Sequence, residues 1–316
     1  MSKITPQITT WVFTLSPEDP GNWQHTFDAA VAADRAGFDR VGLTGEHVCF
    51  GEHLEAYSDP KSGGREGGKQ ATGPDGHYIE PIVTMSMIAA LTKNVRFIPN
   101  IMLAALRRPV VLAKMASSLD VLSNGRLDLG IGVGWQQEEY GAAGIDFAKR
   151  GYHLDQTLEV CQLLWNEQRA SYSSEDLSFE NIHMMPKPVQ KGGVPIWVSG
   201  TVSKPGMRRL ARFGAGWIPW GPATENIDLL IEDIRKMREM VSGFGRDPSD
   251  IQVAGSLPLL KGSDGQIDLE RSIAAVPALY EAGITDFRVG LPIPRDINQA
   301  EDYLTPWVQA FRAITR

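Results

Sequence analysis

Short apolar runs rich in β-formers alternate with amphipathic stretches along most of the 316 residues. This alternation predicts β-α-β units and a parallel sheet. We count eight strand–helix pairs, and eight pairs in about 250 residues fit an α/β fold of the (β/α)8 TIM-barrel type. The predicted strands cover 8–15, 38–44, 95–102, 126–134, 195–200, 216–220, 251–260 and 287–292. The predicted helices cover 23–36, 81–93, 109–123, 152–165, a segment from 203, 226–241, 269–283 and 299–313.

The remaining length falls into two insertions in what we expect to be one domain, 1–316. One insertion, 51–80, follows the second strand, and the other, 166–193, precedes the fifth strand. The first contains seven glycines, which suit either a mobile lid over the barrel mouth or an inert flexible loop. A doubly wound Rossmann sheet is the rival fold. It would need a G-x-G-x-x-G turn after the first strand, and LSPEDPGNW has none.

The composition narrows the class of protein. The charge of −7, with 42% hydrophobic residues, excludes disorder as the main state and argues against nucleic acid or an anionic membrane as the main partner. Two cysteines cannot form a disulfide scaffold and favour a reducing cytoplasm. There is no 18-residue apolar run and no signal-peptide core. We therefore expect a cytoplasmic enzyme or small-molecule binder.

His47 is the one histidine of six that falls at the carboxyl end of a predicted strand, where barrel enzymes place their active sites. Together with Glu46 it could donate or accept a proton, although a histidine that is merely hydrogen-bonded in a loop is the alternative. Metal chemistry is disfavoured, because no set of His, Asp or Glu ligands converges in the pattern. We therefore expect no metal site.

The segment GIGVGW at 130–135 is not a phosphate-binding motif, because its glycines alternate within a strand. Gly130 and Gly132 fit either close packing or the approach of a ligand. Gly134 and Trp135 stand at the strand end, and the Trp135 indole could stack on a planar ring.

An anion site is predicted after the fifth strand. Gly200, Thr201 and Ser203 lead into a helix with a proline in its first turn, which describes either a phosphate site or an ordinary capped helix. Arg107 and Arg108, before the helix at 109, are either a second anionic contact or a solvated pair.

Five stretches in order resemble the luciferase-like monooxygenase superfamily, and specifically its branch of coenzyme F420-dependent oxidoreductases. The resemblance implies a barrel that binds a flavin or 5-deazaflavin ring across its strand ends. It also implies a non-prolyl cis peptide at Asn100–Ile101 under the ring, a phosphate against Gly200, Thr201, Val202 and Ser203, and a functional histidine at His47. The F420 branch usually has Asp where this chain has Glu46, and Glu-His is similar to the FMN-using luciferases. The stretches are 37–48, 106–140, 150–165, 185–200 and 208–219.

The leading hypothesis is an F420-dependent oxidoreductase that transfers a hydride to or from a small organic substrate. His47 would donate the proton or position the substrate, and Glu46 would fix its tautomer or bind the cofactor. The first alternative is an FMN-dependent monooxygenase that uses O₂ and a separate reductase. A non-catalytic flavin-binding protein and a metal-dependent barrel hydrolase are more distant alternatives. Similar proteins are often homodimers.

Overall fold

Eight parallel strands form the barrel that the sequence predicts, in a computed structural model that describes residues 4–62 and 64–315. Their order around the sheet is β5-β3-β1-β12-β11-β10-β9-β6. Isolated parallel bridges, Phe97 to Leu127 and Met102 to Ile131, join β5 to β6 and close the ring. The strands are β1 (Gln7–Val12), β3 (Arg40–Thr44), β5 (Arg96–Asn100), β6 (Leu129–Ile131), β9 (Ile196–Gly200), β10 (Gly214–Pro219), β11 (Gln252–Ser256) and β12 (Asp286–Val289).

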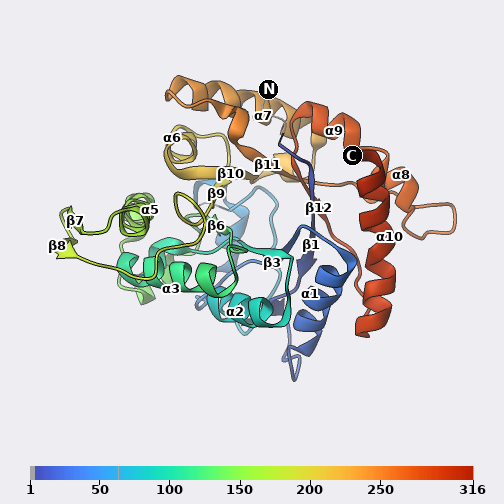
Figure 1. Ribbon diagram of the computed structural model, residues 1–316, viewed down its shortest axis with the longest axis horizontal. Helices are drawn as coiled ribbons and strands as arrows, with labels where there is room; N and C mark the ends of the chain where they lie inside the picture. Colours follow the sequence, from blue (N-terminus) through green and yellow to red (C-terminus); the bar gives the residue numbers. More distant parts are fainter. Residues whose placement is uncertain (1–3, 63, 316) are drawn as a thin grey trace.

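The helices surround the strands (Figure 1), and every predicted helix is present. The predicted helix at 269–283 is divided in two, because Pro277 cannot continue a helix through the preceding turn. A short helix after β6, α4, was not predicted. The helices are α1 (Gln24–Ala36), α2 (Pro81–Leu91), α3 (Pro109–Leu122), α4 (Gln137–Ala142), α5 (Arg150–Asn166), α6 (Lys204–Phe213), α7 (Ile227–Gly243), α8 (Leu269–Ile273), α9 (Val276–Ala282) and α10 (Ile297–Thr315).

Charged side chains close the barrel interior near the amino ends of its strands. Arg40 donates from Nε to Asp128 Oδ2 and from Nη1 to Asp286 Oδ1, both at 2.8 Å. Arg96 donates from Nη2 to the other oxygen of Asp128 at 2.6 Å. Arg40, Asp128 and Asp286 are each buried, so their charges depend on one another for compensation. We call these four residues the amino-end network.

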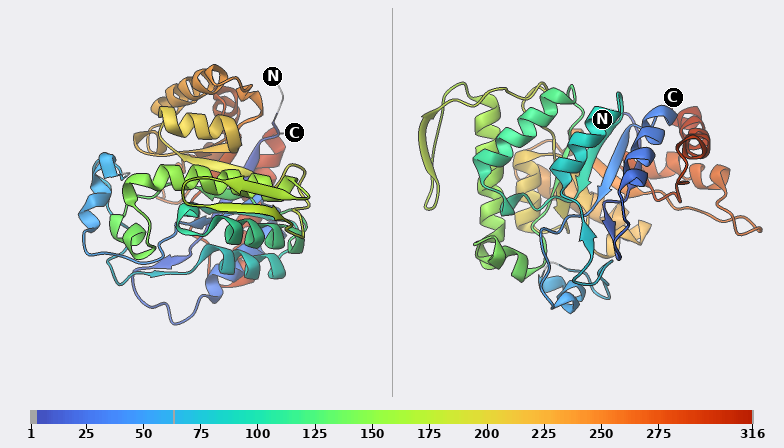
Figure 2. Two further views of the ribbon diagram at one scale, coloured as in Figure 1. Left: turned by 90° about the vertical axis from the view of Figure 1, so that its left-hand side faces the viewer. Right: turned by 90° about the horizontal axis from the view of Figure 1, so that it is seen from below.

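The two insertions lie in different places. Residues 51–80 carry two short 3₁₀ helices, η1 (Leu54–Ser58) and η2 (Pro60–Ser62), and end in β4 (His77–Tyr78), which pairs antiparallel with β2 (Leu15–Ser16). This insertion lies beyond the arrowheads of the strands (Figure 2, right, light blue). The second insertion forms an antiparallel hairpin of β7 (Ala170–Ser173) and β8 (Ser178–Ile182), which stands at one edge of the molecule.

Candidate active site

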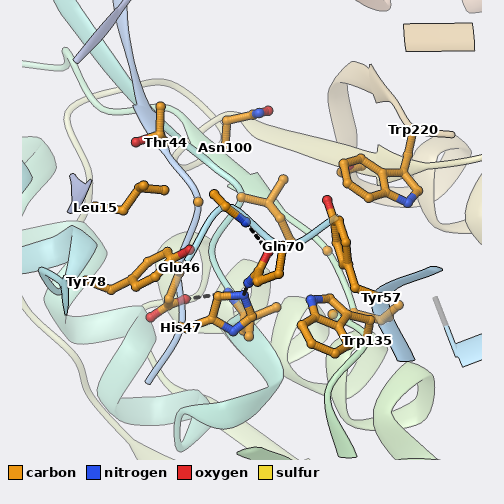
Figure 3. A pocket seen from close by; sticks show the side chains of 18 of the residues that line it. Leu15, Thr44, Glu46, His47, Tyr57, Gln70, Tyr78, Asn100, Trp135 and Trp220 are labelled. Atoms are coloured by element: carbon orange, nitrogen blue, oxygen red, sulfur yellow. Dashed lines mark hydrogen bonds between the residues drawn. The ribbon is translucent and has the colours of Figure 1, made fainter. Parts of the chain in front are cut away.

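A cavity of about 400 Å³ opens at the carboxyl ends of the strands. Its wall is mostly apolar and aromatic, with few polar side chains. In Figure 3, Tyr57, Trp135 and Trp220 lie on one side of it and Leu15 and Tyr78 on the other. The 51–80 insertion therefore contributes side chains to the cavity. The lining residues are Trp11, Phe13, Leu15, Thr44, Gly45, Glu46, His47, Tyr57, Gln70, Ala71, Tyr78, Asn100, Ile101, Leu103, Gly132, Val133, Gly134, Trp135, Ser199, Gly200 and Trp220.

His47 lies in the wall of this cavity between two polar partners. Its Nε2 is 2.8 Å from Nε2 of Gln70, and its Nδ1 is 3.4 Å from Oε2 of Glu139. The Gln70 carbonyl oxygen accepts from the backbone N–H of Ala71, so its amide N–H₂ faces the imidazole. A neutral His47 must then accept at Nε2 and carry its proton on Nδ1, toward Glu139. The Gln70 amide thus selects the tautomer, and Glu139 lies beside Nδ1 without a hydrogen bond to it.

Glu139 is a site residue that the sequence analysis missed. It lies on α4 and is buried, with its other oxygen accepting from the backbone N–H of Val48 at 2.5 Å. That bond fixes the carboxylate against the residue next to His47. A carboxylate held beside Nδ1 stabilises the doubly protonated imidazole. The visible signal was an acidic residue just beyond a strand end, in the segment WQQEEY.

Aromatic rings surround the remaining faces of His47. The ring centroids of Phe50, Tyr78 and Trp135 lie 4.3, 5.2 and 5.7 Å from the imidazole centroid. The His47 side chain is 10% exposed. An imidazole in such surroundings exchanges protons with a bound ligand more readily than with bulk water.

Glu46 lines the same cavity, but its carboxylate is directed away from His47. It accepts from the backbone N–H of Leu103 at 2.6 Å and forms an ion pair with Arg107. Burial raises the pKa of the Glu46 carboxyl above its ordinary value although Arg107 opposes this effect. The carboxylate oxygens of Glu46 thus contact the backbone and Arg107, and the expectation that Glu46 fixes the His47 tautomer stays a prediction. Whether Glu46 binds a cofactor stays a prediction.

Arg107 is not available as a second anion contact. Its guanidinium pairs with Glu46 and also with Glu80, the residue that caps α2. Two carboxylates already compensate its charge, so it offers little attraction to a further anion. The idea that Arg107 contributes an anion contact at this rim is thus not supported.

The peptide bond between Asn100 and Ile101 is cis, as the resemblance implies. Glycines on β6 and just after it make room for this bend. A Cβ on Gly130 would collide with the Pro99 carbonyl oxygen, and a Cβ on Gly132 would lie 2.5 Å from Ile101 Cδ1. Both glycines therefore serve close packing against the bend, and Gly132 also lines the cavity.

Gly134 and Trp135 both line the cavity. Gly134 has a φ of 68°, a conformation that L side chains rarely adopt, and a Cβ there would also press on Leu103. Trp135 is 6% exposed and presents its ring edge-on to both His47 and Tyr57. The indole is therefore packed in place as part of the wall. That it stacks on a planar ligand stays a prediction.

The segment after β9 forms the rim rather than the interior of the cavity. Gly200 lines the cavity, whereas Thr201 and Ser203 are exposed and Val202 packs against the core. The Ser203 hydroxyl caps α6 by accepting from the backbone N–H of Gly206 at 3.3 Å. The capped-helix interpretation is confirmed, and the same helix start keeps the N–H groups and dipole that a phosphate would use.

Within the described residues, 4–62 and 64–315, no three His, Cys, Asp or Glu side chains are grouped to hold a metal ion. None of the helices in this part of the chain has the length and apolar character needed to span a membrane.

Comparisons with known proteins agree with the fold. An uncharacterized protein of Mycobacterium bovis, Mb0978c, is 28% identical over 279 residues, which is 87% of this chain and 90% of the relative. An F420-dependent secondary alcohol dehydrogenase in complex with an F420-acetone adduct superposes with a TM-score of 0.71 at 18% identity, covering 98% of this chain and 99% of that one.

Riboflavin lyase RcaE, solved with modified FMN and riboflavin, superposes with a TM-score of 0.72 at 14% identity, covering 98% of this chain and 92% of that one. At these identities the two structures support the fold alone. The sequence profile described as luciferase-like monooxygenase matches residues 8–276, which is most of the chain. The protein is therefore a member of the luciferase-like monooxygenase family.

Proposed function

We propose that this protein is an oxidoreductase that uses coenzyme F420 for hydride transfer to or from a small organic substrate, with His47 as the proton-transfer group. The observation that carries the proposal is the placement of His47. Its imidazole lies between a buried carboxylate and an amide, in the wall of a largely apolar cavity at the barrel mouth. This is the arrangement expected of a general acid–base, and a protein that only stored a flavin would have no use for it.

The cavity fits a planar ring cofactor. Four lining residues, Gly45, Gly132, Gly134 and Gly200, leave space where side chains would otherwise stand. We assign Asn100, Ile101, Gly134 and Trp135 to the ring, and Gly200, Thr201, Val202 and Ser203 to the phosphate. When bound, F420 would supply or accept a hydride, and the protein would supply orientation and proton management.

His47 would move the proton that accompanies the hydride. In the neutral form its Nδ1 proton faces Glu139, so Nε2 is the atom that accepts a proton from an alcohol or returns one to a developing alkoxide. Gln70 would turn away from Nε2, or give up its hydrogen bond, when substrate takes its place. Glu139 would stabilise the imidazolium that forms. The aromatic wall would exclude water that could compete for the proton.

An FMN-dependent monooxygenase is the second candidate. Glu46 precedes His47 as in the FMN-using luciferases that the sequence resembles, and the riboflavin lyase with modified FMN shares the fold. A partner reductase would then supply reduced FMN, because the chain carries no G-x-G-x-x-G fingerprint for a nicotinamide cofactor. The same cavity would serve both cofactors, so their relative affinities distinguish the candidates.

The test is a titration of the purified protein with F420 and with FMN, each oxidised and reduced, followed by fluorescence. Micromolar binding of F420 with much weaker binding of FMN is the expected result. The reverse preference, together with O₂ uptake driven by reduced FMN, would replace the proposal with the monooxygenase. Binding of neither cofactor would contradict both assignments of the ring and phosphate sites.

A further inference from the structure

A second, smaller cavity adjoins the main one on the side away from His47. Its volume is about 240 Å³. The two cavities are adjacent, because five residues line both: Trp11, Asn100, Ile101, Ser199 and Trp220. The smaller cavity differs in chemistry, because Arg288 and the hydroxyl residues Thr224 and Ser256 also line it. No charged residue other than Arg288 is among its lining residues.

Arg288 lies on β12 with its side chain 4% exposed. Its Nε donates to Asp286 Oδ2 at 2.9 Å, and its Nη1 donates to Asn100 Oδ1 at 2.8 Å. Its Nη2 is buried and has no hydrogen-bond partner among the described residues. The guanidinium carbon is 5.4 Å from the ring centroid of Trp11 and 5.8 Å from that of Trp197, which hold the group in place. A buried donor without an acceptor is costly, so a ligand acceptor would relieve it.

The positive charge of Arg288 is also incompletely compensated. Asp286 is shared between Arg288 and Arg40, and Asp128 is shared between Arg40 and Arg96. Three guanidiniums therefore face two carboxylates, and Arg288 is the one that borders a cavity. Consistent with this, burial lowers the pKa of the Arg288 guanidinium although Asp286 opposes the effect. A bound anion would complete the pairing.

We infer that the smaller cavity binds a carboxylate of the substrate, with Arg288 as its counter-ion and the apolar body of the same molecule in the main cavity. One guanidinium nitrogen without a partner and the Ser256 hydroxyl suit the two oxygens of a carboxylate, whereas a phosphate dianion would call for more donors, since the Thr224 hydroxyl already donates to the Gly221 carbonyl oxygen. The substrate class is then an apolar or aromatic carboxylic acid. This inference rests on the proposed function only in taking the main cavity as the place of the reacting group.

The experiment compares carboxylates with their amides on the protein without added F420 or FMN. Benzoate, phenylacetate and 3-phenylpropionate, each beside its uncharged amide, are titrated while tryptophan fluorescence is followed, because Trp11 and Trp220 line the cavity. At least one acid should bind about tenfold or more tightly than its amide, the ratio expected of a charge-assisted hydrogen bond. Equal binding of every acid and amide, or none, would overturn the inference.

Two arginine variants test whether the preference for the acid over its amide depends on Arg288. Arg288→Met should abolish the preference for the acid. Arg96→Met removes the same charge from the same set of ion pairs, but Arg96 lines neither cavity, so the preference should remain. Loss of the preference in Arg96→Met alone would contradict a direct contact with Arg288.

A third variant covers the case in which Arg288→Met does not fold. Asn100→Asp keeps the size of the side chain and offers Arg288 a permanent carboxylate at the same position. It should fold and lose the preference for the acid; retention of the preference would overturn the inference. Because cofactor is absent throughout, failure here leaves the F420 and FMN titrations unaffected, and failure of those titrations leaves the carboxylate result standing.

Discussion

The two ends of the barrel interior use charge in opposite ways. At the amino end, Arg40, Asp128 and Asp286 are buried in direct contact, so every carboxylate oxygen there has a guanidinium or hydroxyl donor. At the carboxyl end, His47 faces a cavity and keeps a partner that substrate can displace. Carboxylates whose oxygens all have donors stabilise one conformation, whereas a side chain whose partner can be displaced is able to react with a substrate.

This contrast predicts that substitutions at the amino end change folding, and those at the carboxyl end change chemistry. The same division applies to barrel enzymes in general, whose reactive groups gather at the carboxyl ends of the strands. Four experiments test this division in the present chain, in order of decreasing expected effect.

Arg40→Met should destabilise the protein by about 3–5 kcal/mol, because it leaves two buried carboxylates without their shared partner. Chemical denaturation measures the change. Arg35→Met is the matched control: its ion pair with Glu301 is largely exposed, so the loss should be small. Equal stability of the two variants would mean that the amino-end network does not hold the barrel closed.

His47→Ala should lower turnover by about 10²–10⁴-fold, the usual contribution of a general acid–base. Its midpoint of denaturation and its affinity for cofactor should change little, because among the described residues the side chain has only two polar contacts. Steady-state kinetics and the cofactor titration give both values. Unchanged turnover would remove His47 from the mechanism.

Strong acid should weaken the amino end. Burial alone would raise the pKa of the Asp128 carboxyl, but Arg40 and Arg96 outweigh burial and hold its pKa below the ordinary value. A lowered folded pKa gives stability that is complete above the unfolded pKa, about 3.9, and that is lost as the pH falls through the folded value. Asp128 should therefore leave the denaturation midpoint of the wild type level down to about pH 4 and lower it as the pH falls further, and the fall below about pH 4 should be smaller in Asp128→Asn. Parallel curves would contradict this assignment.

Glu139→Gln should reduce turnover by about 10–100-fold, less than the loss of His47 itself, since it removes one charge-assisted contact. The residue positions His47 and does not face the substrate. The loss should appear in kcat, with KM and cofactor affinity little changed, because the substituted side chain touches His47 and not the bound molecules. Reduced stability with an unchanged kcat would leave Glu139 only a structural role.

The sequence was sufficient for the barrel because each strand and helix carries its own local pattern of apolar residues. It was insufficient for α4, which has six residues, and for β2 and β4, which have two residues each. Such elements are too short to show a period, and tertiary contacts decide them. Pro277 marks the break between α8 and α9 in the sequence. The apolar pattern continues on both sides of it, however, and favours a single helix.

The sequence predicted which residues lie at the site, but not which of them contact one another. The rule for strand ends found His47, Gly134 and Trp135, and the resemblance found the cis peptide at Asn100–Ile101. The partners of His47 were missed because Gln70 lies on an insertion and Glu139 on a short helix, neither of them at a strand end. Glu46 was taken as the partner from its place next to His47 in the chain, yet neighbouring side chains at a strand end point to different sides. Arg288 was a charged residue inside an apolar strand, a signal that the sequence analysis did not use.

The contact of Gln70 with His47 has a consequence for engineering this barrel. Gln70 belongs to the insertion after β3, and that insertion also supplies Tyr57 and Tyr78 to the cavity wall. Exchanging the insertion for one from a relative, in order to accept a different substrate, would at the same time remove the donor that selects the imidazole tautomer. Substrate choice and proton transfer are thus inherited together in this chain, and a successful loop exchange will have to carry an amide at the position of Gln70.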